Sequence, residues 1–402
     1  MHVAARLTVV VSSILVFAGC GDPDPFTWIV QPGERSTTLS TPRESGGELV
    51  AAGATSFSDG AGDSRGTLVR LDAGGRVLAS KEYPDWFNLR VVPGPEGQLA
   101  FIGDIESTDA ASLDFEVGVM NAHGEVQRSR RFGAPGIDTA TGLAWTSDGG
   151  LLIAGSTDAY LDLGFGPIVP EGEDAFVLRL DAGGAPLWAH VEGGPQIQRA
   201  FQARLRDDGS TIAVGLTGDV FTPSGFVLAL GPDGAKLWSR ALPGVVPFAL
   251  ELDSEGRIFL AGHDQEDIAM LALDAGGEPR FRRVFPGPSF DSAASIARRP
   301  DGHLLIGGAF TEAVDFGLGP LEARGGADGF LLELDAEGAP VWQLQVSGEG
   351  AELLEGRWSG DGGIFAALAM APPFAGDSKV SLGGAIVRPR GVNDTALLRI
   401  DR

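Results

Sequence analysis

The feature that most constrains the fold is a spacing of glycines that recurs along most of the chain. Two glycines enclose five mostly apolar residues, as in the segments Leu151 to Ala154 and Ile258 to Ala261. The pairs are Gly47/Gly53, Gly97/Gly103, Gly149/Gly155, Gly209/Gly215, Gly256/Gly262 and Gly302/Gly308, and a seventh copy begins at Gly362 without the second glycine. The six steps from Gly47 to Gly362 average 52.5 residues. A period of this length is typical of repeat architectures such as propellers.

A second pattern follows each glycine pair. An apolar run usually ends in Asp or Asn, and Gly follows three residues later, as in Phe176 to Asp181 with Gly184. In four units an aromatic residue lies seven positions after the end of this run, at Trp188, Trp238, Phe281 and Trp342. Each unit therefore contains several short apolar segments separated by turn residues, which is the pattern of consecutive β-strands.

Each unit is predicted to form four strands, which we name A to D in chain order. In one unit the strands cover residues 202–205, 211–214, 226–230 and 236–239. Asp-Gly and Gly-Gly corners supply the positive φ that tight hairpins require. The B strands are small or apolar at every position, as expected of strands buried on both faces.

The two ends of the chain share one unit between them. Phe26 to Val30 resembles a D strand such as Pro186 to His190, but no A, B or C strand precedes it. The last unit supplies A, B and C strands and has no D strand after Asp401. We therefore predict an all-β fold over residues 26–402, a seven-bladed β-propeller of four-stranded blades whose last blade is closed by the N-terminal strand. Closure removes both sheet edges, whereas the alternative, a linear β-solenoid, gives no reason to split a unit.

The first residues have the pattern of a secretory signal. Arg6 precedes an apolar stretch from Leu7 to Phe17, which is shorter than the roughly 20 residues that span a bilayer. Small residues follow, and then Cys20, the only cysteine of the chain. We predict a signal peptide over residues 1–19, cleaved between Gly19 and Cys20, and a short tether over residues 20–25. The alternative is cleavage by the ordinary peptidase, with Cys20 uninvolved.

Two stretches resemble known bacterial sequences. Phe17-Ala18-Gly19-Cys20 resembles the bacterial lipobox, although Phe17 stands where Leu is usual. The resemblance implies that Cys20 is lipidated and anchors the protein to a membrane without a spanning helix. The repeats around Ala175 to Asp181 and Ala313 to Leu321 resemble bacterial β-propeller repeat proteins of the SBBP type, which are common among myxobacterial lipoproteins. That resemblance implies fold and export, and it carries no shared catalytic motif.

The charge limits the possible partners. The chain has 54 acidic and 30 basic residues and a net charge of −24. So acidic a protein repels nucleic acid and anionic headgroups. We expect a monomer that meets the membrane through its lipid anchor only, with an unidentified protein, glycan or small molecule as partner.

No catalytic residue, metal site or cofactor is predicted. The five histidines (His2, His123, His190, His263 and His303) are far apart in sequence, and we expect surface or turn positions. Two acidic clusters, Glu171/Glu173/Asp174 and Asp264/Glu266/Asp267, fall in loops where acids are normally solvated. Phosphate-binding loops and nucleophile elbows are absent from the sequence. A single cysteine also excludes the adjacent-cysteine disulfide often found in quinone-dependent dehydrogenases, whose blades end in a similar Leu-Trp pattern.

Three B–C connections are long. They run from Ser156 to Glu173, from Ala309 to Asp328 and from Ala369 to Asn393. The similar sequences at 162–167 and 315–320 predict a small hairpin in each of the first two connections. B–C and D–A connections share one face of a propeller, so these loops either bind a ligand there or are extra hairpins without one. We expect the core to fold without them.

The sequence therefore favours a binding or scaffold propeller anchored at the cell envelope, facing the periplasm or the exterior. The alternatives are an extracytoplasmic propeller enzyme, either a hydrolase or a quinone-dependent dehydrogenase, and a purely structural envelope protein. The ligand itself is not identified by any motif.

Overall fold

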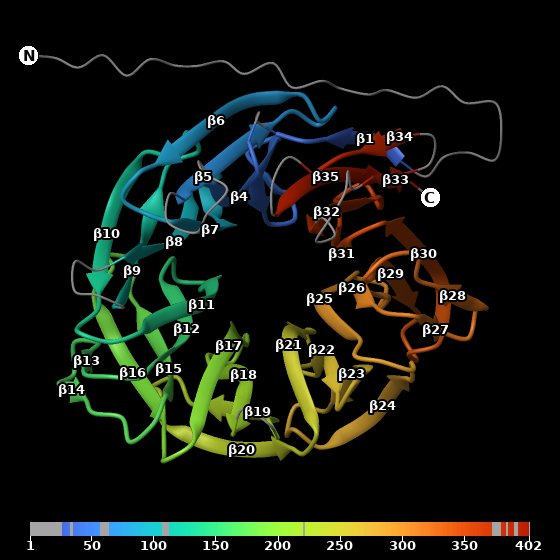
Figure 1. The fold of residues 1–402 in the computed structure, drawn as a ribbon. Coiled ribbons are helices and arrows are strands. Elements are labelled where there is room, and N and C mark those ends of the chain that lie inside the picture. Colours follow the sequence, from blue (N-terminus) through green and yellow to red (C-terminus); the bar gives the residue numbers. More distant parts are fainter. Residues whose placement is uncertain are drawn as a thin grey trace, which may run out of the picture.

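The chain forms a closed ring of small antiparallel sheets (Figure 1). The computed structural model describes residues 26–32, 35–56, 64–106, 112–219, 222–371, 379–382, 385–389 and 393–401. The predicted signal peptide, the predicted cleavage site at Gly19, the predicted lipidation site at Cys20 and the predicted tether lie outside the described residues. Among the helices of the described segments, none is long and apolar enough to cross a membrane.

Seven blades make up the ring, and their strands run A to D from the axis outward. Blade 1 contains β2 (Thr37–Leu39), β3 (Arg43–Ser45), β4 (Glu48–Ser56), β5 (Ser64–Leu71) and β6 (Val77–Tyr83). Blade 2 contains β7 (Asn88–Pro93), the 3₁₀ turn η1 (Pro95–Gly97), β8 (Leu99–Glu106), β9 (Leu113–Met120) and β10 (Val126–Phe132). Blade 3 contains β11 (Asp138–Trp145), β12 (Leu151–Thr157), β15 (Asp174–Leu180) and β16 (Pro186–Glu192). Blades 4 and 5 contain β17 (Ile197–Leu205), β18 (Thr211–Gly218), β19 (Ser224–Leu230) and β20 (Lys236–Leu242); and β21 (Val245–Leu252), β22 (Ile258–Asp264), β23 (Asp267–Leu273) and β24 (Pro279–Phe285).

Blades 6 and 7 complete the ring. Blade 6 contains β25 (Ser292–Arg298), β26 (Leu304–Phe310), β29 (Asp328–Leu334) and β30 (Pro340–Gly348), and blade 7 contains β31 (Ala351–Trp358), β32 (Ile364–Ala371), β35 (Asp394–Ile400) and β1 (Phe26–Val30). Short hairpins are added by β13 (Leu161–Asp162) with β14 (Pro167–Ile168), β27 (Ala313–Asp315) with β28 (Pro320–Glu322), and β33 (Val380–Leu382) with β34 (Ala385–Val387). The predicted strand order holds in every blade.

The N-terminal strand closes the ring as predicted. β1 pairs antiparallel with β35, and Ile29 lies opposite Leu398. Trp28 is only 3% exposed, and its indole nitrogen donates to the carbonyl of Ala73 in blade 1 at 3.2 Å. Blade 7 is therefore built from both ends of the described chain, and Figure 1 shows β1 beside β35.

The core is divided among the interfaces between blades. Among the described residues there are seven clusters of buried apolar residues, and each joins one pair of neighbouring blades. The B strands lie between two such clusters, and every residue of β12 and β22 is buried. The D strands lie at the outer edge, and β6 alternates between half-buried and exposed residues over most of its length. This burial explains why the B segments are apolar at every position whereas the D segments alternate.

The long B–C connections form the predicted hairpins, which lie at the outer edge of the ring (Figure 1). Leu161 and Leu163 are buried in the cluster between blades 2 and 3, and Phe316 is 2% exposed in the cluster between blades 5 and 6. The expectation that the core folds without these loops is therefore wrong for the described hairpins, because they supply part of that core. The hairpins are also far from the ring axis, around which the inner A strands lie.

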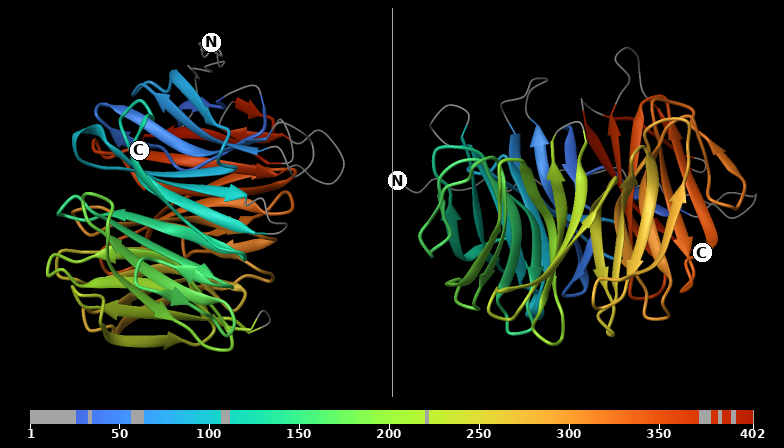
Figure 2. Two further views of the ribbon diagram at one scale, coloured as in Figure 1. Left: turned by 90° about the vertical axis from the view of Figure 1, so that its left-hand side faces the viewer. Right: turned by 90° about the horizontal axis from the view of Figure 1, so that it is seen from below.

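The two faces of the ring differ in their connections, as the side view in Figure 2 illustrates. One face, which we call the turn face, carries the short A–B and C–D turns, such as the hydrogen-bonded turn from Arg206 to Ser210. The other, the loop face, carries the B–C and D–A connections.

Candidate functional site

A cluster of charged side chains gathers at the ring axis near the turn face. Arg43, Arg204, Glu251 and Arg357 come from blades 1, 4, 5 and 7, and each pairs with the B-strand residue three positions before the second glycine or its equivalent. Val92, Ala144 and Ala297 occupy the same register in the other three blades. Strands of the repeat therefore place one residue per blade at this level, and four of the seven are charged.

These side chains interact across the axis. The pKa of Arg43 is lowered to about 9, mainly by burial and to a smaller extent by the charges of Arg357 and Arg204, while Glu251 and Glu355 act in the opposite direction. Blades 1 and 4 are not neighbours, so Arg43 and Arg204 meet only at the axis. We call Arg43, Arg204, Glu251, Glu355 and Arg357 the axial cluster. Even with a pKa of about 9, the Arg43 guanidinium is protonated at neutral pH.

The other members of the axial cluster are shifted for the same reason. Burial lowers the pKa of Arg357, with Glu251 opposing this change and Arg204 adding to it. Burial also raises the pKa of Glu355, against the effect of Arg43 and of the Thr41 hydroxyl. Both shifts favour the neutral forms, so the carboxylate of Glu355 compensates the arginines less than an exposed carboxylate would.

A cavity of about 210 Å³ opens beside this cluster. Its walls are Arg43, Glu44, Pro93, Arg357, Trp358 and Phe365. Glu44 accepts a hydrogen bond from the amide of Gly360 at 3.3 Å. In the part of the chain that the structure describes, no hydrogen bond or ion pair is found for the guanidinium of Arg43 or of Arg357. Two cationic groups with free donors therefore face the cavity, and this is the arrangement that recognises a carboxylate or a phosphate group.

Aromatic rings near the loop face form a second feature. Phe201, Phe248, His263 and Phe290 make a row with centroid distances of 5.3, 5.5 and 5.1 Å. Burial lowers the pKa of His263, and its Nδ1 lies 2.8 Å from the carbonyl oxygen of Gln265. The imidazole is therefore neutral at pH 7 and packs as part of the row, which ends at the exposed ring of Phe290.

Buried carboxyl groups recur between blades at the loop face. Asp138 and Glu352 begin A strands and face Asp114 and Asp328, which lie at the starts of C strands in the preceding blades. Burial, with a smaller effect of the neighbouring acid, raises the pKa of Asp138 to about 6 and that of Glu352 to about 7. Among the described residues no group of three or more potential metal ligands comes together. These pairs join blades, and none of them lies at the axial cavity.

The predicted acidic clusters are not simply solvated. Asp174 and Asp264 are each 7% exposed, because the neighbouring strands and connections cover them. Asp264 forms an ion pair with Arg282, and Asp174 accepts a hydrogen bond from the amide of Gly194. Glu173 binds both Nε and Nη2 of Arg199 at 2.7 Å. The expectation of solvated loop acids is therefore wrong for Asp174 and Asp264.

The described histidines lie in separate places. His123 is exposed in a turn, and His303 lies in an A–B turn with its Nδ1 2.7 Å from Glu333. His190 lies in β16 with its Nε2 3.2 Å from Glu192, and His263 is buried in β22. The surface or turn prediction holds for His123 and His303 and is wrong for His263, whereas His2 lies outside the described residues.

Sequence reasoning missed the axial cluster. Its members lie in four different units, and only Glu355 and Arg357 are close to each other in the sequence. A signal does exist, since Arg204, Glu251 and Arg357 each lie eleven residues before the second glycine position of their repeat. Aligning the units on that position, and then looking for charge at one level, would have found them.

Comparisons with known proteins show the fold alone. No family model matches the chain, and no curated protein matches it. The structure of the Dos1 propeller is similar, with a TM-score of 0.50 and 12% identity over 92% of this chain and 94% of that chain. The acylaminoacyl peptidase of Pyrococcus horikoshii matches with a TM-score of 0.47 and 15% identity over 87% of this chain, which spans about half (52%) of that chain. The propeller domain of the Trilobed protease from Pyrococcus furiosus matches with a TM-score of 0.48 and 12% identity, over 89% of this chain and 96% of that one.

Proposed function

We propose that the protein is a binding module of the cell envelope whose ligand carries an anionic group bound in the axial cavity. The observation that carries this proposal is the pair of guanidiniums, Arg43 and Arg357, which line the cavity without a partner among the described residues. Glu44, the third ionisable group of the wall, is held by a backbone amide, which leaves the cavity with two cations against one carboxylate.

The size and charge of the protein limit the ligand. A volume of about 210 Å³ is below the roughly 300–1,000 Å³ of pockets that enclose a drug-sized molecule, so the cavity holds one group and not a large ligand. The net charge of −24 repels polyanions at longer range. The ligand that fits is therefore a small molecule, glycan or peptide with a single carboxylate or phosphate group.

The binding test uses two single substitutions. In calorimetric titrations with sodium acetate and inorganic phosphate, we expect saturable binding of at least one anion to the wild type. Arg43→Gln and Arg357→Gln should each weaken it at least about tenfold, since a hydrogen bond to a charged group contributes roughly 1.5–3 kcal/mol. Arg76→Gln is the control, because Arg76 is exposed on the outer surface.

Three outcomes contradict or replace the proposal. Absence of binding to the wild type at ~10 mM anion (an affinity of only about −2.7 kcal/mol), or equal affinity of the wild type and both variants, would remove the axial cavity as a site. Turnover of a bound compound would favour the extracytoplasmic enzyme. Neither binding nor turnover across a metabolite, glycan and peptide array would favour the structural envelope protein.

The location is a separate part of the proposal and rests on the sequence. A signal over residues 1–19 and the single Cys20 support an exported lipoprotein. Mass spectrometry of the protein from the membrane fraction should find acyl chains on Cys20, and Cys20→Ser should release unacylated protein. A wild type without lipid would contradict the proposed lipid anchor, but it would not contradict the proposed binding in the axial cavity.

A further inference from the structure

Aromatic rings fill a repeated slot between the outer parts of neighbouring blades. In four interfaces a D-strand ring packs against the C–D turn glycine of the next blade. A Cβ added at Gly75, Gly234, Gly277 or Gly338 would lie between 2.6 and 2.9 Å from the nearest ring atom of Trp28, Trp188, Trp238 or Phe281, respectively. The indole nitrogen of Trp188 also donates to the carbonyl of Pro232 at 2.9 Å, as that of Trp28 does to Ala73. The slot therefore offers a glycine floor and one backbone acceptor.

Two blades carry no aromatic residue at the equivalent D-strand position. In blade 1 this residue is Ala79, and the hydroxyl of Tyr83 takes the place of the ring by donating to the carbonyl of Gly124 at 2.7 Å. In blade 2 it is Arg128, which lies opposite Val119 as Trp188 lies opposite Arg179. The glycine facing Arg128 is Gly184.

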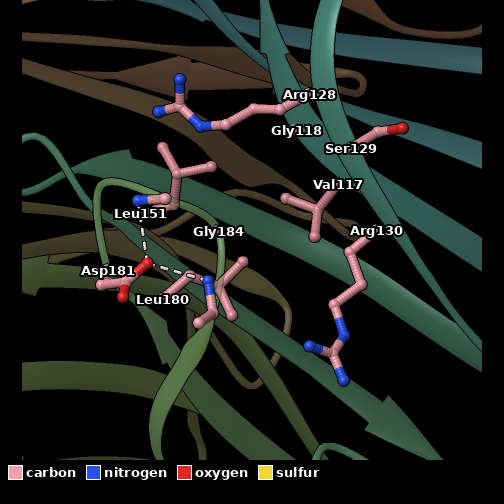
Figure 3. A pocket seen from close by; sticks show the side chains of 11 residues that line it. Val117, Gly118, Arg128, Ser129, Arg130, Leu151, Leu180, Asp181 and Gly184 are labelled. Atoms are coloured by element: carbon pink, nitrogen blue, oxygen red, sulfur yellow. Dashed lines mark hydrogen bonds between the residues drawn. The ribbon is translucent and has the colours of Figure 1, made fainter.

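The slot between blades 2 and 3 is open. Nothing lies within 4 Å of a Cβ added at Gly184. A cavity of about 430 Å³ takes up this space (Figure 3), within the range of ligand pockets. Its apolar walls are Val117, Leu151 and Leu180. Asp181 also borders it, but one carboxylate oxygen already accepts hydrogen bonds from the amides of Gly183 and Ala185, both at 2.8 Å.

The cations of this cavity indicate the charge of an occupant. Figure 3 shows Arg128 and Arg130 extending from β10 toward different ends of the cavity. Within the described segments neither guanidinium has a hydrogen bond or ion pair, although Arg130 lies 5.3 Å from the ring centroid of Phe132. Arg131, the next cation of the strand, is already paired with Asp114.

We propose that this open slot binds an aromatic ring that carries a carboxylate, with indole carboxylates as the best fit. The ring takes the place that Trp28 and Trp188 occupy in blades 7 and 3, against Gly184 and Leu180. The carbonyl of Ala182, at the position of Ala73 and Pro232, accepts the indole N–H. Arg130, at the other end of the cavity from Arg128, binds the carboxylate. The site lies at the outer edge of the ring, so it does not depend on the axial cavity.

The test compares five ligands with wild type and variants. We expect N-acetyl-tryptophan to bind, N-acetyl-tryptophanamide to bind about tenfold more weakly because it lacks the carboxylate, and N-acetyl-leucine not to bind. A tripeptide ending in Trp, compared with indole-3-acetate, distinguishes a peptide C-terminus from a small molecule as the source of this chemistry. Calorimetry or saturation-transfer NMR measures all five.

Arg128→Trp is the decisive variant, because the new indole side chain fills the slot as the aromatic side chains of other blades fill theirs. We expect loss of N-acetyl-tryptophan binding and a higher melting temperature. Arg130→Gln should weaken the acid and leave the amide unchanged, while Arg280→Gln, on the exposed strand β24, should change neither. Arg43→Gln and Arg357→Gln should leave unchanged the part of the binding that Arg128→Trp abolishes, because that part occurs at the outer slot.

Other outcomes overturn the proposal. Binding of N-acetyl-tryptophan by Arg128→Trp with wild-type affinity would place the ring elsewhere. If Arg128→Trp does not fold, the ligand series still decides: equal affinity for acid and amide, insensitivity to Arg130→Gln, or no binding to the wild type each contradicts the assignment.

Discussion

Replacing Glu352 by glutamine tests whether the buried acid pairs between blades make the free energy of unfolding depend on pH. Glu352 is 1% exposed, and burial together with the charge of Asp328 raises its pKa from 4.5 to about 7, against the amides of Gly348 and Gly350. In the folded protein the group is therefore neutral below pH 7, whereas in the unfolded chain it ionises above pH 4.5. The folded state holds the extra proton, so the free energy of unfolding falls as the pH rises through this window.

The size of the effect follows from the shift. At about 1.4 kcal/mol per pKa unit, the change from 4.5 to about 7 corresponds to about 3 kcal/mol. Screening by solvent near the loop face reduces this to about 2 kcal/mol. Glutamine has nearly the shape of the neutral acid and does not ionise. Glu352→Gln should therefore match the wild type near pH 4.5 and exceed it by about 2 to 3 kcal/mol at pH 8.

Urea unfolding at half-unit intervals from about pH 4.5 to 8.5 measures the difference. Asp138, whose pKa is raised to about 6, and the other buried acids that do not interact with Glu352 are present in both proteins, so their contributions cancel. Glu349→Gln, an exposed neighbour, should show no such pH dependence. A difference between wild type and Glu352→Gln that stays constant over the whole range, or that reverses in sign, would refute the reasoning.

Two further substitutions test the architecture. Trp28→Ala removes the ring of the closing strand from the interface of blades 7 and 1, and should lower the free energy of unfolding by about 3–5 kcal/mol in thermal or urea melts; a loss below about 1 kcal/mol would mean that β1 contributes little to closure. Phe316→Ala should cost a similar amount, because that hairpin residue packs 5.0 Å from Phe330 and 5.2 Å from Phe285 between ring centroids. Leu318→Ala in the same hairpin, 41% exposed, should change stability by less than about 0.5 kcal/mol, and equal losses for both residues would contradict the packing described.

The architecture was predictable because one physical unit is repeated. Each blade needs a B strand buried on both sides and positive-φ turns around it, and these demands leave the glycine spacing and the apolar runs in every unit. The split unit at the termini then determined the closure, since the D strand from Phe26 to Val30 had no other blade to complete. One copy of the glycine spacing with its apolar run would not have predicted a propeller, whereas seven copies did.

The functional features were not predictable in the same way. Each of them depends on which residues of different blades come together, and their separation in the sequence ranges from 24 positions for Asp328 and Glu352 to 314 for Arg43 and Arg357. The acids illustrate the difficulty: the sequence pattern of Asp174 and Asp264 indicated solvated loop residues, but neighbouring strands and connections cover both of them. The hairpin from Ala313 to Glu322 read as an accessible loop, although its Phe316 is part of the core. At these positions, outside the regular B segments, the sequence pattern did not indicate that a neighbouring blade buries the residue.

Departures from the repeat nevertheless show where the fold itself does not require the residue. Val92, Ala144 and Ala297 show that an apolar side chain satisfies the axial level of a blade, yet Arg43 and Arg357 stand there in two others. Partly burying guanidiniums without a partner costs free energy, which apolar residues would not. In the same way, Trp188 and Trp238 show what stabilises an outer slot, and Arg128 leaves that slot open. Positions where a repeat gives up stability that its other copies retain are the positions at which a binding role is expected. Both proposed sites meet this criterion, and they do so independently, one at the axis and one at the outer edge.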